Sequence, residues 1–288
     1  MEQSGLVLQG VGGWGLVGLD VAVQVAGWAV SSALKTEKLF DMVGSGTFLA
    51  LSAASFRPGP VATASARVPA MVGLWAVRLG VFLVHRVHKF GGDTRFDEVK
   101  TQPVKFLGYW LLQSVWIAVT CMPMLLLDAS PGAPAPASGT VPLALAGAAL
   151  FALGLATETV ADAQKFAFKN DPANRGKFIA TGLWALSRHP NYFGEILVWL
   201  GVAASAAPAL AAQGGPGYAA LALASPAMVT LLLTKASGVP ILEASADQRW
   251  GGTPDYEAYK ASTPVLVPSL LSILGGGKAT RGKKASPP

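Results

Sequence analysis

Residues 106–127 of the sequence are FLGYWLLQSVWIAVTCMPMLLL, a stretch without a single Asp, Glu, Lys or Arg. An α-helix that crosses the hydrocarbon core of a bilayer needs about 20 consecutive, mostly apolar residues. This stretch has that length and that composition, so we expect a membrane-spanning helix here. Cys121 is the one cysteine of the chain. Within an apolar run it is expected to behave as a small buried side chain.

The rest of the chain belongs to the same class. It is 52% hydrophobic and 13% charged, whereas soluble globular domains carry about 25% charged residues. We therefore predict an all-α membrane bundle of about seven transmembrane helices, forming a single domain over 1–274, followed by a disordered basic tail at 275–288. The seven predicted spans are 11–33, 42–56, 68–85, 106–127, 141–157, 193–212 and 217–234.

The distribution of basic residues orients this bundle. Short loops on the cytosolic side of a membrane collect Lys and Arg. With the N-terminus outside, every one of the 22 Lys and Arg residues falls on the cytosolic side except Arg57, Arg67 and Arg78. The C-terminus is then cytosolic, in the endoplasmic reticulum of a eukaryote or the inner membrane of a bacterium. Because the basic residues lie between apolar runs, we expect membrane lipids or a phosphorylated ligand as partners, and no nucleic acid.

Glycines near the N-terminus allow two interpretations. Gly10-x-Gly12-x-x-Gly15 has the spacing of a dinucleotide-binding loop, but it follows no strand and opens an apolar run, so the context that such a loop requires is missing. Close packing of helices is the better interpretation. Gly18, Ala22 and Ala26 have the small-residue spacing that permits it.

The most informative motif is GLWALSRHPNYFGE at 182–195, directly before the sixth predicted span. Pro190 suits the first turn of a helix, where its missing N–H costs nothing. Helix N-termini attract anions through free N–H groups and the helix dipole. Arg188 and His189 add positive charge at that point, so the motif predicts a site for a phosphate or pyrophosphate.

Glu195 lies about one turn inside the membrane helix that this motif begins. A carboxylate at the centre of a membrane helix costs about 2.5–3.5 kcal/mol on insertion scales, which makes such a residue a functional candidate. The alternative is a structural ion pair with Arg188 or Lys177.

Several motifs in the second half occur in a familiar order. SRHPNYFGE at 187–195 is followed by SGVPILE at 237–243, by RWG at 249–251 and by Tyr256-x-x-Tyr259-Lys-x-x-Thr-Pro264. Together they resemble the C-terminal part of the steroid 5-alpha-reductase superfamily, in its bacterial and plant-type branch. The resemblance implies a cofactor-binding half at about 155–270.

This resemblance implies a membrane enzyme that holds NADPH on the cytosolic side and reduces a carbon–carbon double bond conjugated to a carbonyl. The substrate would be a hydrophobic, lipid- or sterol-like small molecule. By position, Asn191 and Glu195 match residues at the nicotinamide end, Asp162 matches one at the adenosine end, and Lys235 matches a phosphate-binding position. The implied cofactor-binding set is Asp162, Lys177, Arg188, His189, Asn191, Tyr192, Glu195, Lys235, Glu243 and Arg249.

The catalytic candidates are Glu195 and Tyr109. The steroid enzymes grip the substrate carbonyl with a tyrosine, and the comparable stretch here, 83–89, has none. Tyr109 is a possible substitute donor. We predict no metal site, because a single cysteine excludes a thiolate cluster.

Two other functions remain open. Isoprenylcysteine and phospholipid methyltransferases, which use S-adenosylmethionine, share this architecture and an Arg-His-Pro-x-Tyr motif. Asn191 and Glu195 favour the reductase, as does Ala244 after Glu243, where the methyltransferases usually have a second glutamate. A non-catalytic membrane scaffold is the third possibility. No pattern in the sequence specifies an oligomeric state.

Overall fold

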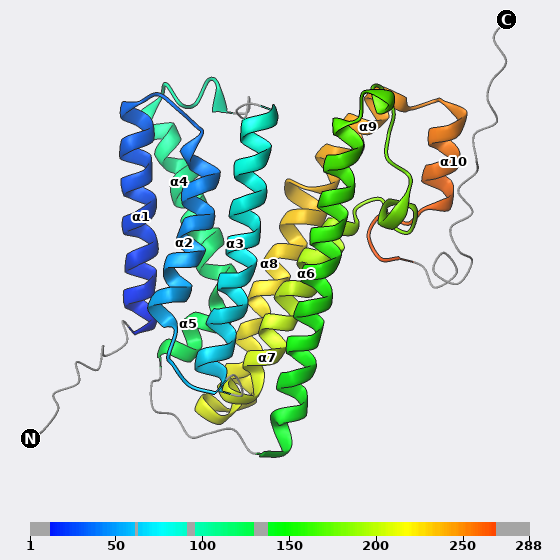
Figure 1. Ribbon diagram of the computed structural model, residues 1–288. Helices are drawn as coiled ribbons and strands as arrows, with labels where there is room; N and C mark the ends of the chain where they lie inside the picture. The colour runs from blue at the N-terminus through cyan, green and yellow to red at the C-terminus, as the bar shows by residue number, and fades with distance from the viewer. Residues whose placement is uncertain (1–11, 61–62, 91–95, 130–137, 269–288) are drawn as a thin grey trace, which may run out of the picture. The chain divides into compact units, whose positions relative to one another are not determined.

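The computed structural model describes residues 12–60, 63–90, 96–129 and 138–268, which are helical and contain no strand (Figure 1). The predicted tail at 275–288 lies outside them. The α-helices are α1 Gly13–Ala33, α2 Leu39–Ser55, α3 Ala64–Phe90, α4 Pro103–Thr120, α5 Met122–Ala129, α6 Val141–Asn170, α7 Pro190–Ala220, α8 Ala224–Leu231, α9 Val239–Trp250 and α10 Pro254–Ser262.

Membrane character is supported, but seven spans are not confirmed. Among the described residues, four helical segments are long and apolar enough to cross a membrane: Gly13–Ala33, Ala64–His85, Val141–Asn170 and Pro190–Trp250. A bent pair, α4 with α5, raises this to five. α2 is apolar but shorter, with 17 residues. The predicted spans 193–212 and 217–234 both lie in Pro190–Trp250, where Gly214 and Gly215 have non-helical backbone angles.

The predicted span at 106–127 is broken rather than continuous. α4 ends at Thr120, and α5 begins at Met122 at an angle of 67°. Pro123 explains the break, because proline has no N–H to donate to the preceding turn and its ring collides with that turn's carbonyl. Cys121 stands at the junction and is fully buried, as expected.

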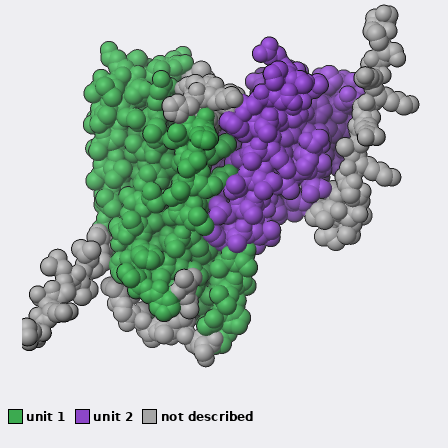
Figure 2. All heavy atoms as spheres, in the orientation of Figure 1, with its two compact units in different colours: residues 1–149, 200–228 green, residues 150–199, 229–288 purple. Residues whose placement is uncertain are grey.

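The chain forms two compact units, shown in different colours in Figure 2. The first unit contains 1–149 and 200–228, and the second contains 150–199 and 229–288. The second unit therefore holds most of the predicted cofactor-binding half.

In the first unit, α1 packs against α2 and α4 through polar contacts. Asp20 accepts a hydrogen bond from Ser114 at 2.8 Å, and Gln24 donates one to Thr47 at 2.9 Å. Hydrogen bonds of this kind hold helices together where water is absent.

The prediction that Gly18, Ala22 and Ala26 pack against another helix is wrong, because all three residues are exposed. A Cβ atom built on Gly18 would have no other atom within 4 Å. The buried stripe of α1 instead contains Asp20 and Gln24.

In the second unit, the backbones of α6 and α7 touch. A Cβ atom built on Gly154 would lie 2.6 Å from the Val198 nitrogen, and one built on Gly194 would lie 2.6 Å from the Glu158 nitrogen. Glycine at both positions therefore permits a separation that side chains would prevent. This contact fixes the end of α6 relative to the turn that begins α7.

Candidate functional site

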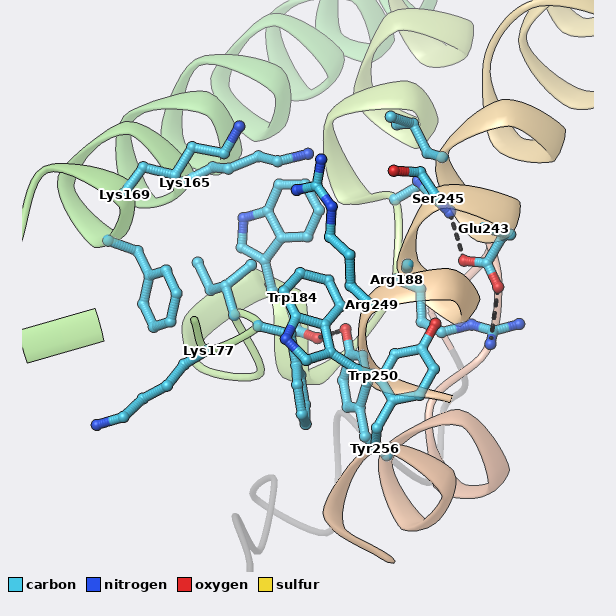
Figure 3. A pocket seen from close by; sticks show the side chains of 17 residues that line it. Lys165, Lys169, Lys177, Trp184, Arg188, Glu243, Ser245, Arg249, Trp250 and Tyr256 are labelled. Atoms are coloured by element: carbon cyan, nitrogen blue, oxygen red, sulfur yellow. Dashed lines mark hydrogen bonds and ion pairs between the residues drawn. The ribbon is translucent and has the colours of Figure 1, made fainter. Parts of the chain in front are cut away.

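A pocket in the second unit is surrounded by the end of α6, the turn before α7, α9 and α10. Its walls are basic and aromatic, with few other polar groups (Figure 3). The lining residues are Lys165, Phe168, Lys169, Lys177, Phe178, Ile179, Trp184, Arg188, His189, Leu242, Glu243, Ser245, Ala246, Arg249, Trp250, Tyr256 and Tyr259.

The turn before α7 is anchored to α6. Gly182 has a φ of +63°, in the left-handed region that glycine adopts without strain. A Cβ there would also collide with the Gln164 amide group. Gln164 accepts a hydrogen bond from the Leu183 nitrogen at 3.0 Å, and Trp184 Nε1 donates to the Ala161 carbonyl at 3.0 Å. Trp184 is thereby fixed as one wall of the pocket.

The segment after α10 holds the same turn from its other side. The Arg188 nitrogen donates to the Pro264 carbonyl at 2.9 Å, and Ser187 Oγ donates to the Leu266 carbonyl at 2.7 Å. Tyr259 Oη donates to the Trp184 carbonyl at 2.7 Å. The backbone that presents Arg188 and His189 is therefore tied at several points.

An aromatic cluster forms the wall on the side of α9 and α10. The Phe178 ring lies 5.3 Å from Tyr256, 5.4 Å from Tyr259 and 5.8 Å from Trp250, measured between ring centroids. Trp250 Nε1 also donates to the Gly176 carbonyl at 2.7 Å. Burial raises the pKa of both tyrosines above the ordinary value, so their hydroxyl groups are neutral donors.

Glu243 connects the pocket's most buried polar groups. Its Oε1 lies 2.8 Å from His189 Nε2, and its Oε2 lies 3.0 Å from Arg188 Nη1. The exposed fractions of the three side chains are 22% for Glu243, 6% for His189 and 12% for Arg188. Burial lowers the pKa of His189 from its ordinary value, and the hydrogen bond to Glu243 opposes this shift without cancelling it. His189 is therefore neutral at physiological pH.

This titration gives a first prediction. A histidine whose pKa is lowered by folding binds fewer protons in the folded state, so the stability rises with pH. We expect the melting temperature to fall as the pH drops below the ordinary histidine value of 6.5. The His189→Gln variant should lose this part of the dependence, measured by thermal unfolding in detergent between pH 8 and pH 5. An identical pH profile in the variant would contradict the assignment.

Several atoms of this cluster lack hydrogen-bond partners among the described residues. They are Nε and Nη1 of Arg188, the latter close to Glu243 but not aligned for a hydrogen bond, and Nδ1 of His189. Buried polar atoms are normally paired, since leaving one unpaired is costly. All three atoms are buried, so none of them is exposed to the pocket itself.

Basic side chains surround this cluster. Lys165 Nζ lies 4.5 Å from the centre of the Trp184 ring. Lys177 and Arg249 are exposed, and neither makes an ion pair within the part of the chain that the structure describes. Lys177 extends away from the other labelled cations in Figure 3. Glu243 is the sole acidic residue among those lining the pocket. The arrangement suits a ligand with negative charge and flat ring surfaces.

The structure brings together half of the predicted cofactor-binding residues. Lys177, Arg188, His189, Glu243 and Arg249 all line the pocket.

The other predicted residues do not line it. Asn191 donates to Asp162 at 3.2 Å, and the Tyr192 ring stacks on His189 with centroids 5.5 Å apart. Glu195 on α7 and Lys235 in a π-helical turn at Leu232–Ala236 lie outside the lining. Tyr109 is in the first unit, beside Phe96. The roles given to these residues stay predictions.

Lys165, Phe168 and Trp184 line the pocket but were not predicted. The spacing of Lys165, Phe168 and Lys169 is a helical one that places all three on one face of α6. The fifth predicted span ends at 157, where its apolar run stops, so the prediction does not include these three residues.

The chain is similar to a family of known proteins and, over a short stretch, to a named relative. It matches a family described as "Protein of unknown function (DUF1295)" over residues 27–263, a range that includes every residue lining the pocket. A probable O-methyltransferase, ustE of Ustilaginoidea virens, is 45% identical over 51 residues, which is 18% of this chain and 18% of that protein. The match thus spans less than a fifth of that relative. No solved structure gives a significant match.

Proposed function

The chain belongs to the DUF1295 family, which is related to membrane proteins of the steroid 5-alpha-reductase and isoprenylcysteine methyltransferase type, and on that premise we propose that it is an NADPH-dependent membrane reductase. Its substrate would be a lipid- or sterol-like compound with a carbon–carbon double bond conjugated to a carbonyl. The pocket of the second unit would hold the cofactor, on the cytosolic side of the membrane.

The observation that carries this proposal is the charge and shape of the pocket lining. Five basic side chains surround it, against Glu243 alone as an acid, and that acid is already engaged by Arg188 and His189. A phosphorylated dinucleotide brings several negative charges and two flat ring systems. S-adenosylmethionine instead brings a positive sulfonium, which a basic pocket disfavours.

The described residues fit the cofactor in a specific way. Arg188, a fixed positive charge in the pocket lining, would attract a phosphate group. Lys165, Lys169 and Arg249 would neutralise further phosphate charge. The partly exposed ring of Trp250 offers a flat surface for a base. When bound, NADPH would supply a hydride to the double bond, and the protein would orient it and exclude water.

Reduction is preferred over methyl transfer on sequence grounds as well. Asn191 and Glu195 follow Pro190 in the order that the reductases show. In the second unit Asn191 is held by Asp162. Methyl transfer remains the second candidate, because a relative with a short match has the printed name of a probable O-methyltransferase.

Ligand binding to the detergent-purified protein separates the two functions. A ligand that binds the folded state raises the melting temperature according to its occupancy. We expect NADPH to raise the melting temperature and S-adenosylmethionine to leave it unchanged. A rise with S-adenosylmethionine alone would overturn the reductase in favour of a methyltransferase, and no rise with either would favour a scaffold.

Removing one exposed charge tests the placement of the cofactor. Arg249→Gln should weaken NADPH binding about fivefold, because one exposed cation contributes modestly to holding a phosphate. Lys105→Gln, an exposed lysine on α4 of the first unit, is the matched control. Lys235→Gln is the informative third variant, since Lys235 matches a phosphate-binding position by sequence but does not line the pocket. A loss with Lys235→Gln but none with Arg249→Gln would place the cofactor elsewhere.

A further inference from the structure

Two buried oxygen atoms on one face of α1 have no hydrogen to accept. They are Oδ1 of Asp20 and Oε1 of Gln24, and neither has a hydrogen-bond partner among the residues that the structure describes. The two residues are 1% and 0% exposed. They are four positions apart, so their side chains are neighbours on the helix. Buried acceptors are normally paired, so two bare ones side by side indicate that a hydrogen is missing.

The other polar atoms of these two side chains link α1 to the neighbouring helices. Ser114 Oγ on α4 donates to Asp20 Oδ2 at 2.8 Å, and Gln24 Nε2 donates to Thr47 Oγ1 on α2 at 2.9 Å. Thr47 Oγ1 in turn donates to the Val43 carbonyl at 2.7 Å. These contacts are the two halves of a hydrogen-bond chain across three helices, and the two bare oxygens lie between the halves.

Thr47 fixes the orientation of the Gln24 amide. A hydroxyl group has a single hydrogen. Two oxygens 2.7 Å apart need a hydrogen between them, so the hydrogen of Thr47 belongs to the Val43 carbonyl. Thr47 can then only accept from Gln24, and an inverted amide would place two oxygens together without a hydrogen. The Gln24 group left for Asp20 is therefore the amide oxygen, which cannot donate.

An ionised Asp20 would be poorly compensated in these surroundings. It makes no ion pair within the described part of the chain. The charged side chains of the three helices packed against α1 are Asp41, Asp128 and one cation, Lys105, which is exposed. Cys121 is a titratable neighbour of Asp20, and a thiol brings no positive charge. A buried carboxylate with one hydrogen bond and no cation is costly in an apolar bundle.

We propose that Asp20 is a proton-binding site inside the first unit, where its carboxyl group carries a hydrogen on Oδ1 and donates it to Gln24 Oε1. One hydrogen then satisfies both bare oxygens and completes a chain from Ser114 through Asp20 and Gln24 to Thr47. Hydrogen bonds in such a chain strengthen one another. The proton thus joins α4, α1 and α2 without a buried charge. The inference does not depend on which ligand the pocket of the second unit binds.

A sodium ion is the alternative occupant of the same oxygens. Hard cations bind carboxylate and amide oxygens, and they take about six ligands. The bare oxygens of Asp20 and Gln24 fall far short of that number, whereas they match the needs of a single hydrogen. The tests below separate these two occupants.

Infrared difference spectroscopy on the detergent-purified protein detects the hydrogen. A protonated carboxyl group has a C=O stretching band that a carboxylate lacks. At neutral pH we expect such a band, shifted down in deuterium oxide and lost in Asp20→Asn. Gln24→Leu should move the band to higher frequency, because the hydrogen loses its acceptor.

Gln113→Leu is the matched control for Gln24→Leu. The Gln113 Oε1 atom is also buried and unpaired among the described residues, but its amide packs against Gly44 on α2 and donates to the Phe40 carbonyl at 3.3 Å. The band should therefore stay in place in Gln113→Leu. A band that moves in Gln113→Leu and not in Gln24→Leu would overturn the proposed chain.

Thermal unfolding in detergent gives an independent test. Asparagine resembles a protonated aspartic acid, with an acceptor for Ser114 and a donor for Gln24, so Asp20→Asn should melt within about 2 °C of the unsubstituted protein. Asp20→Ala leaves both partners unpaired and should melt lower by about 5 °C or more. The melting temperature of the unsubstituted protein should be the same in sodium chloride and in choline chloride.

Three results would overturn the proton site. The first is the absence of a carboxylic acid band that disappears in Asp20→Asn. The second is an equal loss of stability in Asp20→Asn and Asp20→Ala, which would show that the charge is needed. The third is a melting temperature that sodium raises in the unsubstituted protein and not in Asp20→Asn, which would assign the site to a sodium ion.

Discussion

Glu243→Ala is expected to cause the largest loss of any single substitution in the pocket, both in stability and in ligand binding. The variant leaves the Arg188 guanidinium and the His189 imidazole without the carboxylate that each contacts, at 3.0 Å and 2.8 Å. Removing one partner of a fully buried pair costs about 3–5 kcal/mol. Glu243 is 22% exposed, so we expect about 2–3 kcal/mol and a melting temperature lower by about 5–10 °C.

Binding should fail for a second reason. Without Glu243, no contact at Nε2 fixes which ring nitrogen of His189 carries the hydrogen. The Arg188 side chain also loses the carboxylate that holds it at the pocket. We expect NADPH binding to fall by at least about thirtyfold, the product of losses at two contacts of roughly 1 kcal/mol each. The measurements are thermal unfolding in detergent and a titration with NADPH.

Glu243→Gln is the matched control for this variant. Glutamine keeps the size and one acceptor oxygen, so one of the two contacts survives. Its melting temperature should lie between those of the unsubstituted protein and Glu243→Ala. If Glu243→Ala unfolds at the same temperature as the unsubstituted protein, Glu243 is not the link that the geometry indicates.

How far the sequence predicts this molecule depends on which physical signal is used. Apolar runs predict the helical, membrane class, because a chain with so few charges cannot be solvated by water along its length. They do not predict where helices end. α6 continues to Asn170 although its apolar run ends near 157, since Glu158, Asp162 and Lys165 are compatible with a helix and merely end the run.

Helix breaks and buried faces are also missed when apolar runs alone are considered. Pro123 lies inside the charge-free run at 106–127, and the chain bends by 67° between α4 and α5. Gly18 belongs to a face of small residues that is exposed, whereas Asp20 and Gln24 on α1 are buried and hydrogen-bonded. The packed face of α1 combines these polar side chains with Gly27, so the spacing of small residues alone does not identify it.

The candidate site is partly predictable for a related reason. Arg188 and His189 could be selected because they add positive charge at the start of a membrane helix, and Glu243 because the motif that contains it resembles the steroid 5-alpha-reductase superfamily. Lys165 and Trp184 could not, because their contact depends on how the turn at Gly182 docks on α6 through Gln164. Pairing of this kind is a property of the tertiary structure, and no local pattern contains it.

Gly194→Ala is expected to disrupt the second unit, although it adds a single methyl group. The added carbon would lie 2.6 Å from the Glu158 nitrogen, 2.8 Å from the Gly154 carbonyl oxygen and 2.9 Å from Glu158 Cβ. Two of these atoms belong to the backbone of α6, so a side-chain rotation cannot relieve the overlap and the helices must separate. We expect a cost of about 3 kcal/mol, at the upper end for overpacking, and a melting temperature lower by about 10 °C.

Gly46→Ala is the control for Gly194→Ala, because a Cβ at Gly46 on α2 has no atom within 4 Å. Alanine favours a helix over glycine by about 1 kcal/mol, so this variant should be slightly stabilised.

Gly154→Ala should resemble Gly194→Ala, and the double variant should lose less stability than the sum of the two single losses, because both methyl groups open one interface. Equal melting temperatures for Gly46→Ala and Gly194→Ala would contradict this contact. If the contact holds, NADPH binding should fall along with stability in Gly194→Ala, because α6 carries Lys165 and the turn before α7 carries Arg188 and His189. The glycine of the motif would then serve the site through the approach of two helices, without touching the ligand.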